Sequence, residues 1–180
     1  GAGGVGSALI QIARAVTSLR VVATASRPDT RQWCLDLGAH AVVDHSGPID
    51  EALTAAGERA PKYIASLTHT QAHFESLARA VGVQGVIGCI DDFKGLPIEL
   101  LKQKSAGFVW EFMFTRSLEQ TPDMIAQHKL LSEVSRLVDS GALRTTLTEN
   151  LGRLSVENLL KGHRQLESGS TIGKVALDGF

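Results

Sequence analysis

The sequence has little net charge, few cysteines and no long apolar run. Its 180 residues hold 18 Lys plus Arg and 19 Asp plus Glu. This near-balance argues against a nucleic-acid binder, which would show a basic excess or a basic stripe. No apolar stretch reaches the roughly 18 residues that a membrane-spanning helix needs, and the first residues do not read as a signal peptide. The two cysteines, Cys34 and Cys89, cannot form a metal cluster alone and are typical of a reduced, cytoplasmic protein.

The chain opens with a glycine-rich motif. Residues 1–6 fit the pattern G-x-G-x-x-G, which joins a strand to a helix in dinucleotide-binding folds. The spacing of apolar residues after the motif, alternating between four and three, predicts a helix. These residues are Val5, Leu9, Ile12, Val16 and Leu19. The run 20–25 predicts a strand, and the strand expected before the motif, a central one in a doubly wound sheet, lies outside the chain.

The glycines have a chemical interpretation. A cofactor pyrophosphate binds the backbone N–H groups at the start of a helix, where the helix dipole is positive. Gly3 and Gly4 leave room for that approach, and Gly6 lets helix and strand pack closely. A glycine-rich turn without a ligand is the alternative that the motif alone leaves open.

The end of the 20–25 strand bears on the choice of cofactor. An NAD site usually carries an acid about 20 residues after the glycines, where it binds the ribose 2′-hydroxyl. Here Ser26 and Arg27 occupy that window, and the first acid is Asp29. A hydroxyl beside a guanidinium suits a 2′-phosphate, which favours NADP over NAD. The alternative is that Ser26 and Pro28 only start the next helix.

Strands and helices are predicted to alternate along the chain. Expected strands are 41–43, 62–66, 86–90 and an apolar run at 108–114; expected helices are 28–38, 49–56, 71–81 and 98–103. In the 71–81 helix, Phe74, Leu77, Ala78 and Val81 are expected to face inward. This alternation predicts an α/β, Rossmann-type doubly wound parallel sheet with helices on both faces. Ligands bind such sheets at the carboxyl ends of the strands, which nominates 66–69 and 89–91.

The pattern changes after Thr121. A long helix is predicted for 121–140, ended at Gly141, then a strand at 143–147. A further helix at 155–168 has a partial capping box formed by Ser155 and Asn158, and a last strand follows at 173–177. We therefore divide the chain into a dinucleotide-binding domain, 1–140, and a C-terminal segment, 141–180.

Several segments together resemble a known superfamily. They are Gly1-Ala2-Gly3-Gly4-Val5-Gly6-Ser7, Thr24-Ala25-Ser26-Arg27-Pro28, Leu37-Gly38-Ala39, Trp110-Glu111-Phe112-Met113, and Leu166-Glu167-Ser168-Gly169 with Gly173-Lys174-Val175. The chain resembles the C-terminal part of a medium-chain dehydrogenase/reductase. It is most similar to the quinone-oxidoreductase and zinc-type alcohol dehydrogenase-like branch. A full member is roughly twice this length, and the resemblance implies that 141–180 rejoins an N-terminal catalytic domain.

The resemblance implies contacts with each part of the cofactor. For the phosphates, Gly3, Gly4 and Val5 meet the pyrophosphate, and Ser26 and Arg27 bind the 2′-phosphate. Lys174 takes the place of a basic residue that approaches the cofactor in relatives. For the remainder, His45 lies beside the adenosine, Ser66, Leu67 and Thr68 flank adenine and ribose, Cys89, Ile90 and Asp91 line the nicotinamide side, and Trp110, Glu111 and Phe112 contact the carboxamide. Family dimers commonly pair the last sheet strand, which predicts a homodimer through 107–114.

A metal site is not expected in this chain. His69 and His73 are four residues apart and could share a helix face, but no glutamate follows His69 and no third ligand is near. The resemblance places any zinc ligands in the catalytic domain. Cys89 is interpreted as a core residue rather than a nucleophile, because no base is spaced beside it.

These observations predict NADPH binding within an oxidoreductase. The reaction would transfer hydride from the nicotinamide to an enone, quinone or carbonyl substrate, a small molecule. No residue of the chain is a convincing proton donor, so the isolated chain is expected to turn over little. A non-catalytic nucleotide-binding or dimerisation module stays open as an alternative, as does an NAD-dependent zinc alcohol dehydrogenase, which would need an acid near Ser26.

Overall fold

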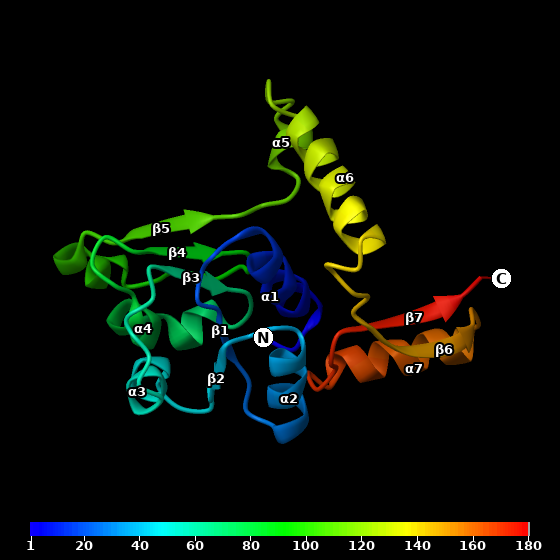
Figure 1. The fold of residues 1–180 in the computed structure, drawn as a ribbon, viewed down its shortest axis with the longest axis horizontal. Coiled ribbons are helices and arrows are strands. Elements are labelled where there is room, and N and C mark those ends of the chain that lie inside the picture. The colour runs from blue at the N-terminus through cyan, green and yellow to red at the C-terminus, as the bar shows by residue number, and fades with distance from the viewer. Residues whose placement is uncertain (180) are drawn as a thin grey trace. The chain divides into compact units, whose positions relative to one another are not determined.

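A computed structural model describes residues 1–179 and divides into two compact units. The first unit contains Gly1–Val42 together with the segment that begins at Glu133, and the second contains Val43–Ser132. Figure 1 colours the elements in chain order, and each unit is described separately below. No helix within residues 1–179 is long and apolar enough to cross a membrane.

Helices and strands alternate through most of the chain, as the sequence predicts. In chain order the elements are α1 (Gly4–Val16), β1 (Val22–Thr24), α2 (Pro28–Asp36), β2 (Ala41–Val43), α3 (Ile49–Ala55), β3 (Tyr63–Ser66), α4 (Thr70–Ala80), β4 (Val86–Cys89), η1 (Ile98–Lys104), β5 (Gly107–Trp110), α5 (Thr115–Leu118), α6 (Ile125–Asp139), β6 (Leu147–Arg153), α7 (Val156–Glu167) and β7 (Lys174–Asp178). Over the described residues these strands form three separate sheets, β1-β2, β3-β4-β5 and β6-β7, so the single joined sheet of the prediction is not seen.

The first unit has a small core built by α1, β1, α2 and β2. Its buried side chains are mostly small, and they are Ala2, Ile10, Ala23, Ala25, Cys34, Leu37, Ala39 and Val42, with Val21 and Trp33 packed against them. Small residues allow the helices to lie close to the short strands. Gly38 ends α2 with a positive φ of 103°, as its position after the predicted helix indicates.

The apolar stripe that predicts α1 does not face this core. Val5, Leu9 and Val16 are 51%, 40% and 55% exposed, whereas Ile10 and Ser7 on another side of the helix are buried. The helix prediction is therefore confirmed, but its apolar stripe is left on the surface of the described residues.

The C-terminal part of the first unit is a β6-α7-β7 unit. The two strands run parallel, with Leu147 opposite Lys174 and Asn150 opposite Ala176. Ser155 caps α7 by accepting a hydrogen bond from the Asn158 backbone N–H at 3.1 Å, which confirms the predicted helix start. Gly162 brings the helix close to β6, because a Cβ there would lie 3.2 Å from the Leu151 side chain.

The second unit is built on the parallel sheet β3-β4-β5. Ser66 lies opposite Cys89, and Cys89 lies opposite Trp110, so the carboxyl ends of the three strands meet at one edge. Helix α4 packs Phe74, Leu77 and Ala78 into the core, as the periodicity predicts. The Lys104 ammonium stabilises the end of α4 by donating to the carbonyls of Ala78 and Val81 at 3.0 and 2.8 Å.

Several predicted boundaries are wrong. The strand predicted at 143–147 is β6, which only begins at Leu147. A search for apolar runs misses most of β6, because its sequence includes the polar residues Thr148-Glu149-Asn150. The run 108–114 is a strand only as far as Trp110. The helix predicted for 121–140 begins at Ile125, the 98–103 helix is a 3₁₀ helix, and the short α5 was not predicted.

Candidate functional site

The start of α1 is an open turn without a capping side chain. Gly3 is the N-cap of this 13-residue helix, no side chain hydrogen-bonds there, and the first turn has no acid. A Cβ on Gly3 would meet no atom within 4 Å, whereas one on Gly6 would lie 2.3 Å from the Gly1 carbonyl oxygen. Gly6 therefore serves packing, and Gly3 leaves free the space in front of the helix N-terminus.

The Lys174 side chain lies against this turn. A Cβ on Gly4 would lie 2.3 Å from Lys174 Cε and 2.8 Å from its Nζ, so a side chain at position 4 would displace the end of the lysine. The ammonium group thus sits at the positive end of the helix dipole, and the two positive contributions need an anion to offset them. The geometry brings the predicted residues Gly3, Gly4 and Lys174 together.

Backbone contacts hold Lys174 in place. Gly173 forms an isolated parallel bridge with Gly3 and donates its N–H to the Ala2 carbonyl at 2.8 Å. The Lys174 N–H donates to the Thr146 carbonyl at 2.8 Å. Gly173 has a φ of +61°, and a Cβ on it would lie 2.3 Å from the Thr146 oxygen, so no other residue fits.

Ser26 and Arg27 follow β1 on the same unit. Ser26 is exposed. The Arg27 guanidinium donates to the Ser170 carbonyl at 2.7 Å and to the Asp29 carboxylate at 3.4 Å. The Arg27–Asp29 pair is exposed, with side chains 42% and 61% accessible. We call Gly3, Gly4, Val5, Ser26, Arg27 and Lys174 the glycine-turn site.

A second group of predicted residues lies at the carboxyl ends of β3, β4 and β5. We call it the strand-end site and define it as Ser66, Leu67, Thr68, Cys89, Ile90, Asp91, Trp110, Glu111 and Phe112. Sheet register brings Ser66, Cys89 and Trp110 to one edge. Their exposure divides them, because Ser66 and Cys89 are buried whereas Thr68, Ile90, Trp110 and Phe112 are exposed.

The buried members form a hydrogen-bond network around Thr70. Its hydroxyl donates to Asp91 Oδ1, and its backbone N–H donates to Asp91 Oδ2 at 3.0 Å. Because that hydroxyl has a single proton, Ser66 must donate to it across their 2.6 Å contact. Cys89 Sγ donates to Asp91 Oδ1 at 3.1 Å. The Asp91 carboxylate therefore anchors the start of α4 to the ends of β3 and β4.

Electrostatics fix the protonation states in this network. Burial would raise the pKa of Asp91, but the hydrogen bonds from the Thr70 hydroxyl and backbone N–H outweigh burial and hold the pKa below its ordinary value. Burial raises the pKa of the Cys89 thiol, so it stays protonated near neutral pH. A protonated thiol that donates to a carboxylate is not an activated nucleophile.

The network also stabilises an unusual backbone conformation. His69, the N-cap of α4, has a φ of 54° in the left-handed region. The Asp91 bond to the next residue's N–H satisfies a helix donor that His69 does not cap with its side chain. Thr70 is thus the central residue of the network that supports the strand-end site, although no sequence motif indicates it.

His45 is half-buried in the second unit. Its Nδ1 is buried and has no hydrogen-bond partner among residues 1–179, and its ring packs edge to face on His73 with centroids 6.3 Å apart. Burial lowers the pKa of His45, and the neighbouring His73 lowers it further. Its imidazole is therefore neutral near pH 7.

Aromatic side chains gather beside β5. Phe93 stacks on Trp110 with centroids 4.7 Å apart, and Phe108 meets Trp110 edge to face at 5.5 Å. Trp110 is nevertheless 55% exposed. One side of its ring is therefore covered by Phe93, and the rest is available to a ligand or a partner.

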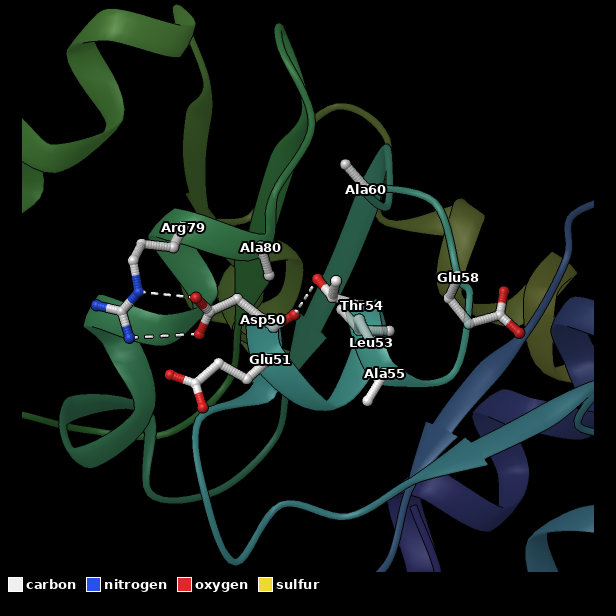
Figure 2. A pocket seen from close by; sticks show the side chains of 9 residues that line it. All are labelled: Asp50, Glu51, Leu53, Thr54, Ala55, Glu58, Ala60, Arg79 and Ala80. Carbon is white, nitrogen blue, oxygen red and sulfur yellow. Dashed lines mark hydrogen bonds and ion pairs between the residues drawn. The ribbon is translucent and has the colours of Figure 1, made fainter.

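A cavity of the second unit lies away from the strand-end site. Figure 2 shows this hollow of about 500 Å³ between α3 and α4, where Arg79 donates to both oxygens of Asp50 at 2.8 and 3.3 Å. Its lining residue Ala60 precedes β3, so it lies by the amino end of that strand, whereas the strand-end site lies at the carboxyl end. Among residues 1–179, no three His, Cys, Asp or Glu side chains are placed to hold a metal ion.

Comparison with known proteins places the chain among dehydrogenases. The zinc-binding dehydrogenase family matches residues 37–177. A zinc-type alcohol dehydrogenase-like protein of Staphylococcus epidermidis is 36% identical over 179 residues, which are 99% of this chain and 53% of that protein. A solved candidate zinc-dependent alcohol dehydrogenase from Rhizobium etli CFN 42 has a TM-score of 0.94 and 48% identity, over 99% of this chain and 52% of its own.

More distant structures share the fold. A mycobacterial protein complexed with NADPH has a TM-score of 0.80 at 20% identity, over 98% of this chain and 54% of its own. A crotonyl-CoA carboxylase/reductase in complex with NADP has a TM-score of 0.69 at 20% identity, over 97% of this chain and 47% of its own. This chain spans about half the length of the curated relatives that it matches.

Replacing Thr70 by valine should destabilise the protein by about 1–3 kcal/mol, because Ser66 loses its buried acceptor and Asp91 loses a donor. Urea denaturation of the full-length protein measures the change. Thr70→Ser is the matched control, since it keeps the hydroxyl and should recover most of the loss. Equal stability of the valine variant and wild type would contradict the network.

Stability should fall as the pH is lowered through the ordinary histidine pKa of 6.5. His45 has a lower pKa when folded, so below that pH the unfolded chain binds more protons than the folded one. Urea denaturation at about pH 7.5 and pH 5.5 should show a smaller loss for His45→Gln than for wild type. His163→Gln, at an exposed histidine on α7, should keep the wild-type slope. The same slope in all three proteins would rule His45 out.

Proposed function

Because the chain belongs to the zinc-binding dehydrogenase family, we propose that it is the NADPH-binding part of an oxidoreductase. One observation carries the proposal, namely the Lys174 ammonium against Gly4 at the open N-terminus of α1. Backbone N–H groups, a helix dipole and a lysine converge there without a protein acid in the first turn. A pyrophosphate is the anion that suits this arrangement in a family that uses nicotinamide cofactors.

The choice of NADPH rests on Ser26 and Arg27. Ser26 is exposed and offers a hydroxyl, and Arg27 has guanidinium donors beyond the two that bind Ser170 and Asp29. An exposed ion pair such as Arg27–Asp29 has little net strength, so a 2′-phosphate can compete with it. The NADPH and NADP complexes among the structural relatives support this choice.

The strand-end site is proposed to receive the adenosine and nicotinamide. Half-buried Leu67 and exposed Thr68 follow β3 beside the predicted adenine and ribose. Exposed Ile90 follows β4 and exposed Trp110 ends β5, on the predicted nicotinamide side. Ser66, Cys89 and Asp91 flank or line the cofactor in the prediction, and their polar side-chain atoms are bonded within the Thr70 network. In this proposal they shape the site and do not bind the cofactor through their side chains.

The cofactor, when bound, supplies hydride from its nicotinamide to an enone, quinone or carbonyl carbon. Lys174 offsets the pyrophosphate charge, and Thr70 with Asp91 holds the ends of β3 and β4 in position. The Cys89 thiol faces Asp91 and is buried, so it is not proposed as the proton donor. We place the residues that bind and protonate the substrate in the other half of the protein, which the longer relatives contain.

We further propose that β5 pairs with a second copy of this chain. β5 is one of the two edge strands of its sheet, and the residues on and after it expose large apolar side chains. They include Val109, Trp110, Phe112, Met113 and Phe114. An exposed apolar edge strand needs cover, and pairing with its own copy supplies it by symmetry.

Calorimetric titration of the full-length protein should show NADPH binding at least about tenfold more tightly than NADH. Arg27→Asp should weaken NADPH binding by about tenfold or more and spare NADH, because it places an acid beside the 2′-phosphate. Arg59→Asp, the same charge change at an exposed arginine of the second unit, is the control. Equal effects of Arg27→Asp on both cofactors would refute the 2′-phosphate assignment. Absence of binding by either cofactor would favour a non-catalytic module.

Sedimentation velocity should show a dimer for the wild-type protein and a shift toward monomer for Val109→Lys. The substitution puts like charges on both copies at the paired edge, where their repulsion opposes association. Val156→Lys, at an exposed apolar residue on α7, should leave the dimer intact. A monomeric wild type, or a Val109→Lys variant that dimerises as well as wild type, would refute the interface.

A further inference from the structure

Trp33 on α2 connects three segments of the first unit. It is partly buried and packs against the core of that unit. Its indole N–H donates to Ser7 Oγ on α1 at 2.8 Å. The Arg144 guanidinium lies over the ring at 5.7 Å from its centroid, and the Arg144 backbone N–H donates to Gln11 Oε1 at 2.9 Å. The indole is therefore held from two sides by groups attached to α1.

The far end of the same ring reaches the turn before β7. A Cβ on Gly173 would lie 3.3 Å from Trp33 Cζ2, which means that the benzo ring packs on the Gly173 backbone. Gly173 is the residue before Lys174, and its own N–H is bonded to Ala2. The position of the ring thus limits where the Gly173 backbone can lie.

The two residues that Trp33 contacts, Ser7 and Gly173, both donate hydrogen bonds to one carbonyl. Ala2 O accepts from Ser7 Oγ at 3.1 Å and from the Gly173 N–H at 2.8 Å. Trp33 binds the first of these donors through its N–H and packs on the second through its benzo ring. A residue that only filled the core would not need a polar atom at this point, and Phe or Leu would serve as well.

We propose that Trp33 is a positioning residue for cofactor binding, acting through Lys174. The indole fixes the Gly173 backbone against Ala2, and this sets the Lys174 ammonium at the N-terminus of α1, where the pyrophosphate would bind. The inference rests on the proposed function, because it assigns Lys174 to the cofactor phosphates. Trp33 itself does not touch the cofactor in this arrangement.

A double-mutant cycle separates this role from simple packing. The four proteins are wild type, Trp33→Phe, Lys174→Met and the double variant, each studied as the full-length protein with NADPH as the titrant. Phenylalanine keeps an aromatic ring but removes both the N–H and the atoms that reach Gly173. We expect Trp33→Phe to weaken NADPH binding about fivefold or more in the wild type, but less than about twofold when Lys174 is methionine.

Cys34→Ala is the matched packing control. Cys34 follows Trp33 on α2 and is fully buried in the same core, so its truncation should lower stability. It contacts neither Ser7 nor Gly173 through any described hydrogen bond, so NADPH affinity should stay within about twofold of wild type. A second ligand, adenosine 2′-monophosphate, lacks the pyrophosphate and should bind wild type and Trp33→Phe alike.

Two outcomes would overturn the inference while leaving NADPH binding intact. One is unchanged NADPH affinity in Trp33→Phe despite lower stability, which is the behaviour of a core residue. The other is an equal loss in the presence and absence of Lys174, which would make the two residues independent.

Failure of the proposed function has a different signature, because wild type would then bind neither NADPH nor NADH. The rate at which Lys174 is labelled by reductive methylation, followed by peptide mass spectrometry, then decides the positioning role on its own. Faster labelling in Trp33→Phe than in Cys34→Ala would support it, and equal rates would refute it.

Discussion

The close approach of Gly173 to the glycine turn is the constraint on which the first unit depends. Two backbone segments that are 170 residues apart meet at Gly3 and Gly173, and the Ala2 carbonyl joins them through a hydrogen bond of 2.8 Å. Gly173 cannot carry a side chain, because a Cβ there would lie against the Thr146 carbonyl oxygen, and a side chain on Gly4 would displace the end of Lys174. Because β7 begins at Lys174, this contact also fixes the start of the β6-β7 sheet. Packing and the anion site therefore arise from the same few atoms.

The two parts of the candidate site use charge in opposite ways. In the glycine-turn site, Lys174 and Arg27 are at or near the surface, and their positive charges face solvent. In the strand-end site, the Asp91 charge is directed inward and is satisfied by Thr70 and Cys89. The internal satisfaction of Asp91 matters, because burying an unpaired carboxylate would cost free energy.

Sequence patterns were sufficient for the elements whose apolar residues face a core. Helix α4 is an example, because Phe74, Leu77 and Ala78 are both periodic and buried. Sequence patterns failed where apolar periodicity and burial do not coincide. The stripe on α1 is periodic but exposed, and β6 is a strand whose middle is polar, because it pairs with β7 through backbone hydrogen bonds that need no apolar residue. The spacing rules also cannot find Thr70 or Trp33, because their partners Asp91 and Gly173 are distant in sequence. Predicting the role of Thr70 would have required the strand register, which places Ser66 opposite Cys89.

The hydrogen bonds of Asp29 bear on the choice between NADPH and NADH. Asp29 is the first acid after the glycine turn and could in principle bind a ribose hydroxyl, as the acid of an NAD site does. Its Oδ1, however, accepts the Thr30 backbone N–H at 2.8 Å inside the first turn of α2 and also faces Arg27. A carboxylate that stabilises a helix N-terminus loses that interaction if it turns toward a ribose. The bond from Arg27 to Asp29, in contrast, is long and exposed, and Arg27 has guanidinium donors beyond those bound to Asp29 and Ser170. The local structure thus restrains the Asp29 carboxylate and leaves the Arg27 guanidinium able to reorient. A 2′-phosphate requires this arrangement.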